Sequence, residues 1–95
     1  MISYWKKPKE FYVDNGMSLI FGWYDHENKD DGGIKALGVH WGFYPHSRGG
    51  LSPCVIPKAT RNAILAGLLQ QAVIDGKRAN IDSILEAIEF FKTPN

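Results

Sequence analysis

The chain has 95 residues, of which 44% are hydrophobic and 22% are charged, and its formal net charge is +1. This balance is typical of a folded globular protein and excludes a chain that is disordered throughout. The length favours a single domain over residues 1–95. A net charge this small creates no broad positive field, which argues against nucleic acid as a partner.

The cysteine content and the lack of long apolar segments indicate in which cellular compartment the protein is found. Cys54 is the only cysteine, so the chain contains no intramolecular disulfide and no Cys-rich metal site. No segment approaches the ~20 apolar residues of a membrane span, and Met1–Glu10 lacks the apolar core of a signal peptide. We therefore expect a cytoplasmic protein without membrane contact. We expect no metal and no other cofactor.

The N-terminal half predicts strands. Glu10–Val13 and Met17–Asp25 are apolar runs on either side of Asp14-Asn15-Gly16, whose residues tolerate the positive φ angles of a tight turn, so they predict a β-hairpin. Polar residues 26–33 predict an exposed loop, and alternation predicts a third strand over Ile34–Tyr44. One face of the two later strands carries the large side chains of Met17, Leu19, Phe21, Trp23, Lys35, Leu37, Val39, Trp41 and Phe43. The opposite face includes Gly22, Gly38, His40 and Gly42.

The C-terminal half predicts two helices. Pro45–Pro57 is rich in proline and glycine and predicts an irregular connection, with a short edge strand near Cys54–Ile56. From Thr60, or from Pro57 if the helix begins earlier, apolar residues at helical spacing predict a helix that ends at Gly76. Asn80 is predicted to cap a second helix. The two apolar stripes are Ile64, Leu65, Leu68, Leu69, Ala72 and Val73, and Ile81, Ile84, Leu85, Ile88 and Phe91.

These elements predict an α+β fold. A three- or four-stranded, mainly antiparallel N-terminal sheet is covered by two C-terminal amphipathic helices, while the strand order and the covered sheet face stay open. A domain of this length has a thin core, yet aromatic residues make up 13% of the chain. We therefore expect a homo-oligomer, most simply a homodimer, that shares the remaining aromatic surface.

The first candidate site is the Pro45–Pro57 segment where it leads into a helix. Free N–H groups at a helix start favour anions, and basic side chains nearby would add to this preference. The predicted ligand-binding residues are His46, Arg48, Lys58 and Arg61. The spacing matches neither a phosphate-binding P-loop nor a dinucleotide fingerprint, so the alternative is a plain connection.

The second candidate site is an interface or ligand surface on the sheet. Glycines within strands often mark the close approach of another backbone or of a ligand, and the Gly22 and Gly38 face fits that description. The predicted surface residues are Trp23, Tyr24, His40, Trp41 and Tyr44. The alternative is a helix packed closely on the same face.

The leading functional hypothesis is a small binding or interaction module that recognises a protein or a small molecule. Aromatic abundance without a catalytic signature favours association over chemistry. The first alternative is a small enzyme in which His46 or His40 activates Cys54 near Arg48. Against it, a lone cysteine is more often a small buried hydrophobe.

Two further alternatives use the sheet and the polar loop. Single-stranded nucleic acid would stack on Phe21, Trp23, Trp41 and Phe43 if that face were exposed, whereas two covering helices would make these residues core. A metal would use the loop residues Asp25, His26, Glu27, Asp30 and Asp31. Their spacing is not that of a calcium loop, so a solvated acidic loop is the favoured interpretation.

Overall fold

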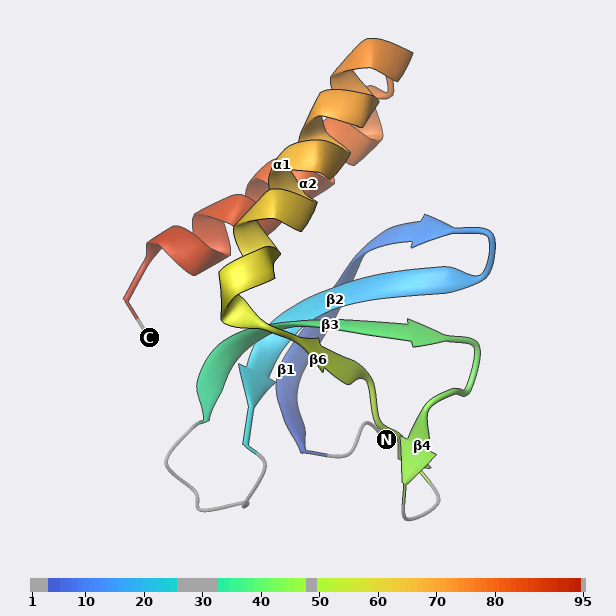
Figure 1. Cartoon of the computed structure of the whole chain (residues 1–95), viewed down its shortest axis with the longest axis vertical. Coiled ribbons are helices and arrows are strands. Elements are labelled where there is room, and N and C mark those ends of the chain that lie inside the picture. Colours follow the sequence, from blue (N-terminus) through green and yellow to red (C-terminus); the bar gives the residue numbers. More distant parts are fainter. Residues whose placement is uncertain (1–3, 26–32, 48–49, 95) are drawn as a thin grey trace.

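The structure, a computed structural model, describes residues 4–25, 33–47 and 50–94. Its elements are β1 (Trp5–Asp14), β2 (Met17–Tyr24), β3 (Ile34–Trp41), β4 (His46–Ser47), β5 (Gly50–Leu51), β6 (Cys54–Ile56), α1 (Lys58–Asp75) and α2 (Arg78–Lys92). An antiparallel sheet has the order β1-β2-β3-β6, and β4 pairs with β5 in a separate hairpin. The predicted α+β class is confirmed: a four-stranded antiparallel sheet is followed by two helices (Figure 1).

The hairpin between β1 and β2 forms at the predicted turn, where Asn15 and Gly16 have φ angles of 51° and 82°. β1 is longer than predicted, because it begins at Trp5 rather than at Glu10. Its register against β2 shifts between Lys6 and Lys9. This irregularity accommodates Pro8, which has no N–H to donate to a regular ladder.

β3 ends at Trp41 and not at the predicted Tyr44. The N–H groups of these two residues donate to each other's carbonyl oxygens at 2.7 and 3.0 Å, around a turn that contains Gly42 with a φ of 61°. The positive φ of Gly42 reverses the direction of the chain, and this turn ends β3 at Trp41. The predicted edge strand at Cys54–Ile56 is confirmed as β6, which pairs with β3.

α1 begins at Lys58, directly after Pro57, and its C-terminal cap is the predicted Gly76. Gly76 has a φ of 68°, a left-handed conformation that glycine adopts without the penalty of a Cβ atom. The N–H of Gly76 donates to the Val73 carbonyl at 3.1 Å, which closes the last turn. Neither helix in the described part of the chain combines the length and the apolarity needed to cross a membrane.

α2 begins earlier than predicted. The connection after Gly76 is short, and Lys77 stands at the N-terminal cap of a helix that starts at Arg78. Asn80 therefore lies inside the first turn, so the prediction that it caps the helix was wrong. A tight left-handed turn returns the chain to helical geometry within two residues, which leaves no room for a longer capping segment.

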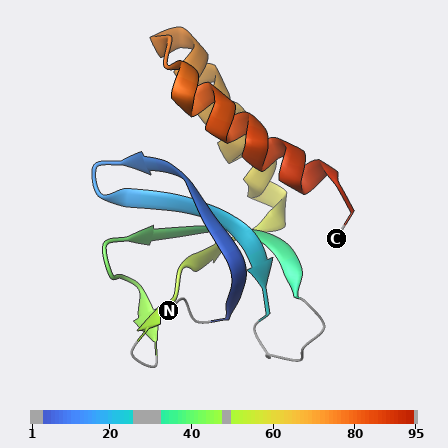
Figure 2. The ribbon, with the colours of Figure 1, turned by 180° about the vertical axis from the view of Figure 1, so that it is seen from behind.

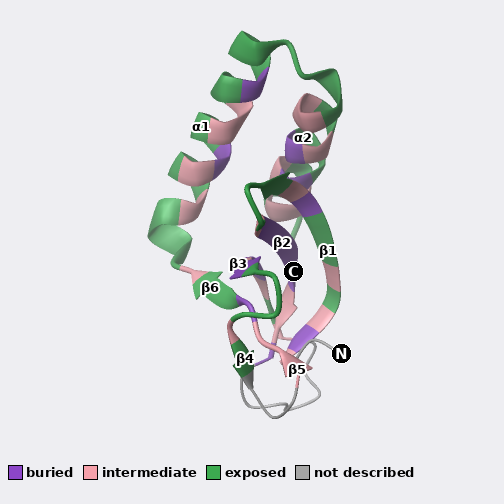
Figure 3. Ribbon diagram, turned by 90° about the vertical axis from the view of Figure 1, so that its right-hand side faces the viewer, coloured by how far each residue is buried: buried purple, intermediate pink, exposed green. Residues whose placement is uncertain are grey.

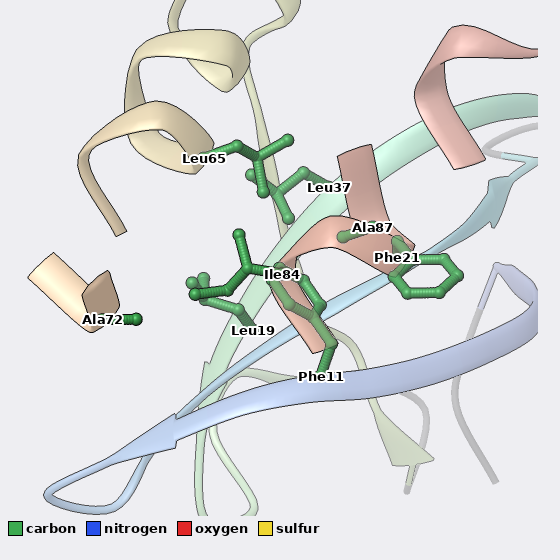
Figure 4. Close-up of a cluster of buried hydrophobic side chains, with 8 residues drawn as sticks. All are labelled: Phe11, Leu19, Phe21, Leu37, Leu65, Ala72, Ile84 and Ala87. Carbon is green, nitrogen blue, oxygen red and sulfur yellow. The ribbon is translucent and has the colours of Figure 1, made fainter. Parts of the chain in front are cut away.

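The helices cover the face of the sheet that carries the large side chains. α2 packs on β1 and α1 packs on β3, and the outward sides of both helices are exposed (Figure 3). The core between these layers consists of Phe11, Leu19, Phe21, Leu37, Leu65, Ala72, Ile84 and Ala87 (Figure 4). Of the four aromatic residues predicted on this face, Phe21 is core and Trp23 is half-buried. Trp41 and Phe43 are exposed, so the covering helices bury only part of the aromatic surface.

Two residues of the predicted stripes lie outside this core. Val73 is 59% exposed and Leu85 is 46% exposed. The helical hairpin extends well beyond the sheet (Figures 1 and 2), so Val73, near the end of α1, lies past the edge of the described sheet. The helical period assigned both residues to the apolar side. The limited extent of the sheet leaves Val73 exposed, whereas Leu85 is exposed because it points away from the core that its neighbour Ile84 enters.

The opposite face of the sheet has a small core of its own, formed by Trp5, Ile20, Ala36 and Tyr24. The Trp5 indole N–H donates to the Pro53 carbonyl at 3.2 Å. A Cβ atom at Gly38 would lie 2.6 Å from Cζ2 of Trp5, and one at Gly22 would lie 3.0 Å from Cα of Pro8. At these two glycines the chain itself occupies the space that the sequence left open to a ligand, a partner or a helix.

Candidate anion-binding site

Three segments that are far apart in the sequence meet at one corner of the molecule (Figure 1). Ile56 of β6 pairs with Leu37 of β3 in antiparallel register. The first turn of α1, which follows β6, therefore lies beside the start of β3. The antiparallel helical hairpin then returns the last turn of α2 to the same corner.

Lys35 fixes α2 to the sheet. Its Nζ donates to the Phe90 carbonyl at 2.6 Å, to the Thr93 carbonyl at 2.9 Å and to the Thr93 hydroxyl, and it lies 4.6 Å from the centre of the Phe90 ring. The carbonyl groups at a helix C-terminus carry partial negative charge, which stabilises a cation there. The Lys35 ammonium is thus a positive charge in a defined position.

Arg61 lies between the sheet and α2. Its guanidinium carbon is 4.0 Å from the centre of the Phe91 ring, and its Nη1 donates to the Lys35 carbonyl at 3.4 Å. Its Nε is buried and has no hydrogen-bond partner among the described residues. Burial lowers the pKa of the Arg61 guanidinium below its ordinary value, because a charged group loses hydration there. The group still remains a cation at neutral pH.

A cavity of about 330 Å³ opens at this corner. Its lining residues are Ile34, Lys35, Lys58, Arg61, Phe91 and Thr93. Three of the six are cations, and none carries a carboxylate. Lys58 is exposed and begins α1, whose first turn contains no acidic residue, so the partial positive charge of the helix start adds to that of the side chains.

This arrangement is suited to holding an anion. The planar guanidinium group matches the geometry of a carboxylate or a phosphate, and the lysines add positive charge. The lining residues include no His, Cys, Asp or Glu. Comparisons with family models, with curated proteins and with solved structures found no match for this chain.

The cavity contains two of the four residues that the sequence predicted for a ligand. Lys58 and Arg61 lie together in it. His46 stands in β4, with its ring 5.3 Å from that of Tyr44, at the far end of β6 from α1 (Figure 1). Arg48 lies outside the described residues.

Sequence reasoning missed the other half of this site. Lys35, Phe91 and Thr93 come from β3 and from the end of α2, far from the Pro45–Pro57 segment. One signal was present, because Lys35 belongs to the large-residue face of its strand. A lysine among buried apolar neighbours needs acceptors for its N–H groups, and the end of α2 provides them.

Three of the five predicted surface residues are largely covered by the chain itself. Trp23 is half-buried, with its ring 4.9 Å from Phe90, and the Tyr24 ring lies 5.4 Å from Trp5. His40 is only 9% exposed, and its Nδ1 lies 3.2 Å from a backbone carbonyl oxygen. These three side chains offer little area to a partner.

The other two predicted surface residues belong to an exposed group that we call the aromatic turn, formed by Trp41, Phe43 and Tyr44. Their exposed fractions are 50%, 84% and 59%. The two backbone hydrogen bonds between Trp41 and Tyr44 hold this turn in one conformation. Three large aromatic side chains are therefore available on one short, ordered segment.

The residues of the enzyme hypothesis stand in different strand pairs. Cys54 is exposed and pairs with Val39 in the main sheet, whereas His46 pairs with Leu51 in the small hairpin. Within the described ranges no hydrogen bond joins Cys54 to His46. Neither residue lines the cavity at Arg61.

The metal hypothesis falls mostly outside the described residues, which exclude His26, Glu27, Asp30 and Asp31. Asp25 is described, and its carboxylate lies 2.9 Å from the Lys6 ammonium. That contact makes Asp25, which is buried, part of an ion pair with the partly exposed Lys6. Elsewhere in the described ranges, no group of three or more His, Cys, Asp or Glu residues is placed to hold a metal ion.

Proposed function

We propose that this protein is a small binding module for an anionic small molecule, whose negative group lies beside Arg61 and Lys58. The observation that carries the proposal is the buried Arg61 Nε, which has no acceptor among the described residues. It belongs to a cavity that is lined by three cations and no carboxylate. A bound anion would supply the missing negative charge, and it would accept from the Nε–H once the Arg61 side chain turns that group toward the cavity.

The energetics of burial support this proposal. A buried N–H group without an acceptor costs on the order of 1–3 kcal/mol, so such groups are rare in folded proteins and call for an explanation. Hydrogen bonds between a guanidinium and an anion are among the strong ones in proteins. A carboxylate or a phosphate monoester fits this donor set, and the cavity volume of about 330 Å³ is at the small end of the ligand-site range.

The test is a titration of the protein with acetate and with inorganic phosphate, followed by NMR at the Arg61 Nε–H and at the first backbone amides of α1. We expect saturable shifts at both positions, and at least tenfold weaker binding in Arg61→Gln and in Lys58→Gln. Lys58 is exposed, so its variant keeps the fold. The matched control is Arg78→Gln, an exposed arginine at the start of α2. Shifts that are absent, or equal in all variants, would refute the proposal.

A second candidate function is self-association through the aromatic turn. Phe43 is 84% exposed at an ordered turn between two other exposed aromatic residues. Aromatic residues are enriched at the centres of protein interfaces, where their burial contributes much of the binding free energy. A second copy of the chain offers the same surface and would form a two-fold symmetric contact.

Sedimentation equilibrium over a wide concentration range tests this association. We expect a monomer–dimer equilibrium that Phe43→Ser shifts strongly to the monomer. Val13→Ser is the control, since Val13 is 57% exposed in β1 and lies outside the aromatic turn. A monomer at the highest concentration, or an equal shift in both variants, contradicts the idea.

A further inference from the structure

A second cavity, of about 410 Å³, adjoins the anion site. It lies between the helices, and its apolar lining consists of Leu65, Ala66 and Leu69 from α1 and Ile88 and Phe91 from α2. Arg61 and Phe91 line both cavities. The stacked pair of Arg61 and Phe91 is therefore the boundary that the two spaces share.

The two cavities differ in chemical character. The first is dominated by cations, whereas the second is walled by aliphatic side chains, with Asn62 and Lys92 as its further polar members. Lys92 already has a carboxylate partner, because its ammonium lies 3.6 Å from Glu89. An occupant of both spaces would be charged at one end and apolar at the other.

We infer that the ligand is an amphipathic anion, an acid whose head group lies at Arg61 and Lys58 and whose alkyl chain lies in the cavity between α1 and α2. This inference rests on the proposed anion binding and specifies the rest of the ligand. Charge complementarity orients the molecule, because the first cavity is lined by three cations and no carboxylate. Apart from the shared Arg61, the second cavity has only Asn62 and Lys92 as polar lining residues, and the Lys92 ammonium is already paired with Glu89.

A free small molecule fits the second cavity better than a peptide terminus does. The walls are helices, whose backbone N–H and C=O groups are already bonded within each helix. A peptide backbone would lose its hydration there and find few new partners, at a substantial free-energy cost. An alkyl chain has no such groups. A volume of about 410 Å³ also lies within the ~300–1,000 Å³ range of small-molecule sites.

The experiment measures the dissociation constants of acetate, butyrate, hexanoate and octanoate by NMR or calorimetry. Burying one methylene group strengthens binding by about fourfold, so we expect affinity to rise at each step until the cavity is full. Octyl phosphate should bind about as tightly as octanoate if the site accepts both phosphate and carboxylate head groups. If the affinity rises with chain length for only one of the two head groups, the inference is still supported, and the result identifies which head group the site binds.

A matched pair of variants localises the chain. Ala66 is exposed and lines the second cavity, while Ala63 is exposed on the same helix and does not. Ala66→Gln should weaken octanoate at least fivefold and leave acetate unchanged, and Ala63→Gln should change neither. Glutamine is a good helix former, so both variants keep α1.

The outcomes separate the two proposals. If acetate and phosphate bind through Arg61 but longer chains bind no better, the inference is overturned and the anion site stands. If no anion binds at all, the proposed function fails with it. Binding of a peptide ending in leucine more tightly than octanoate would overturn the choice of a small molecule.

Discussion

At the scale of single residues, Gly38 shows how one position depends on a distant part of the chain. The Trp5 ring lies where the Gly38 side chain would project, and its N–H is held by the Pro53 carbonyl. The indole cannot easily move away without losing this hydrogen bond. A glycine that weakens β3 on propensity is therefore required by packing.

Gly38→Ala should destabilise the protein by about 1–3 kcal/mol, because the new Cβ forces a rigid ring from its place. Urea unfolding followed by tryptophan fluorescence measures the change. Gly67→Ala is the control, since Gly67 lies in α1 with nothing within 4 Å of the added atom. This control should be neutral or more stable by up to ~1 kcal/mol. Similar losses in both variants would show that Trp5 does not constrain Gly38.

At the scale of elements, α2 is buried along one side and exposed along the other. Ile84 and Ala87 are 0% exposed and face the core, while Leu85 is 46% exposed although it is equally apolar. A helix places neighbouring residues about 100° apart, so adjacent positions differ sharply in burial. The stability of the helix layer should follow this difference.

Ile84→Ala should reduce the free energy of unfolding by about 2–5 kcal/mol, through lost apolar burial and the cavity left behind. Leu85→Ala should cost less than about 1 kcal/mol, since much of that side chain is already in water. Urea denaturation of both variants makes the comparison. If Ile84→Ala does not fold, Ile84→Val should still cost about 0.5–1.5 kcal/mol. A larger loss of unfolding free energy in Leu85→Ala than in Ile84→Ala would contradict the assignment of the core-facing side of α2.

At the scale of the whole molecule, the sheet is covered on both faces. The helices cover one face, and Trp5 with its neighbours forms the smaller core on the other. Tyr24 packs against that smaller core beside Tyr4, with ring centres 6.3 Å apart. Burial, and to a lesser extent repulsion from Tyr4, raises the pKa of the Tyr24 hydroxyl above its ordinary value of 10.0.

This shift makes the stability of the molecule sensitive to alkaline pH. The folded state holds the Tyr24 proton more tightly than the unfolded state, so its contribution is complete below pH 10 and is lost as the pH rises through the folded pKa. We expect the free energy of unfolding to fall above pH 10, and to fall less steeply in Tyr24→Phe. Urea unfolding between pH 8 and 11 tests this expectation. An identical pH profile in the two proteins would contradict it.

The sequence predicted the features that depend on neighbouring residues. The Asn15-Gly16 turn, the alternation of β2 and β3, the stop at Gly76 and most of both helical stripes follow from backbone stereochemistry and side-chain period. It also predicted two cations of the candidate site, Lys58 and Arg61, because both lie near one helix start. The prediction that Asn80 caps α2 was wrong, because the backbone geometry of the turn at Gly76, and not a capping preference, sets where the helix starts.

Tertiary structure alone decided which segments share a space. Lys35, Arg61 and Phe91 meet only because β6 pairs with β3 and the helical hairpin returns to the same corner. Likewise, Val73 is exposed because the sheet ends before α1 does. Local sequence sets the conformation of each segment through short-range sterics, whereas cavities, charge clusters and burial arise from contacts between residues that no sequence period relates.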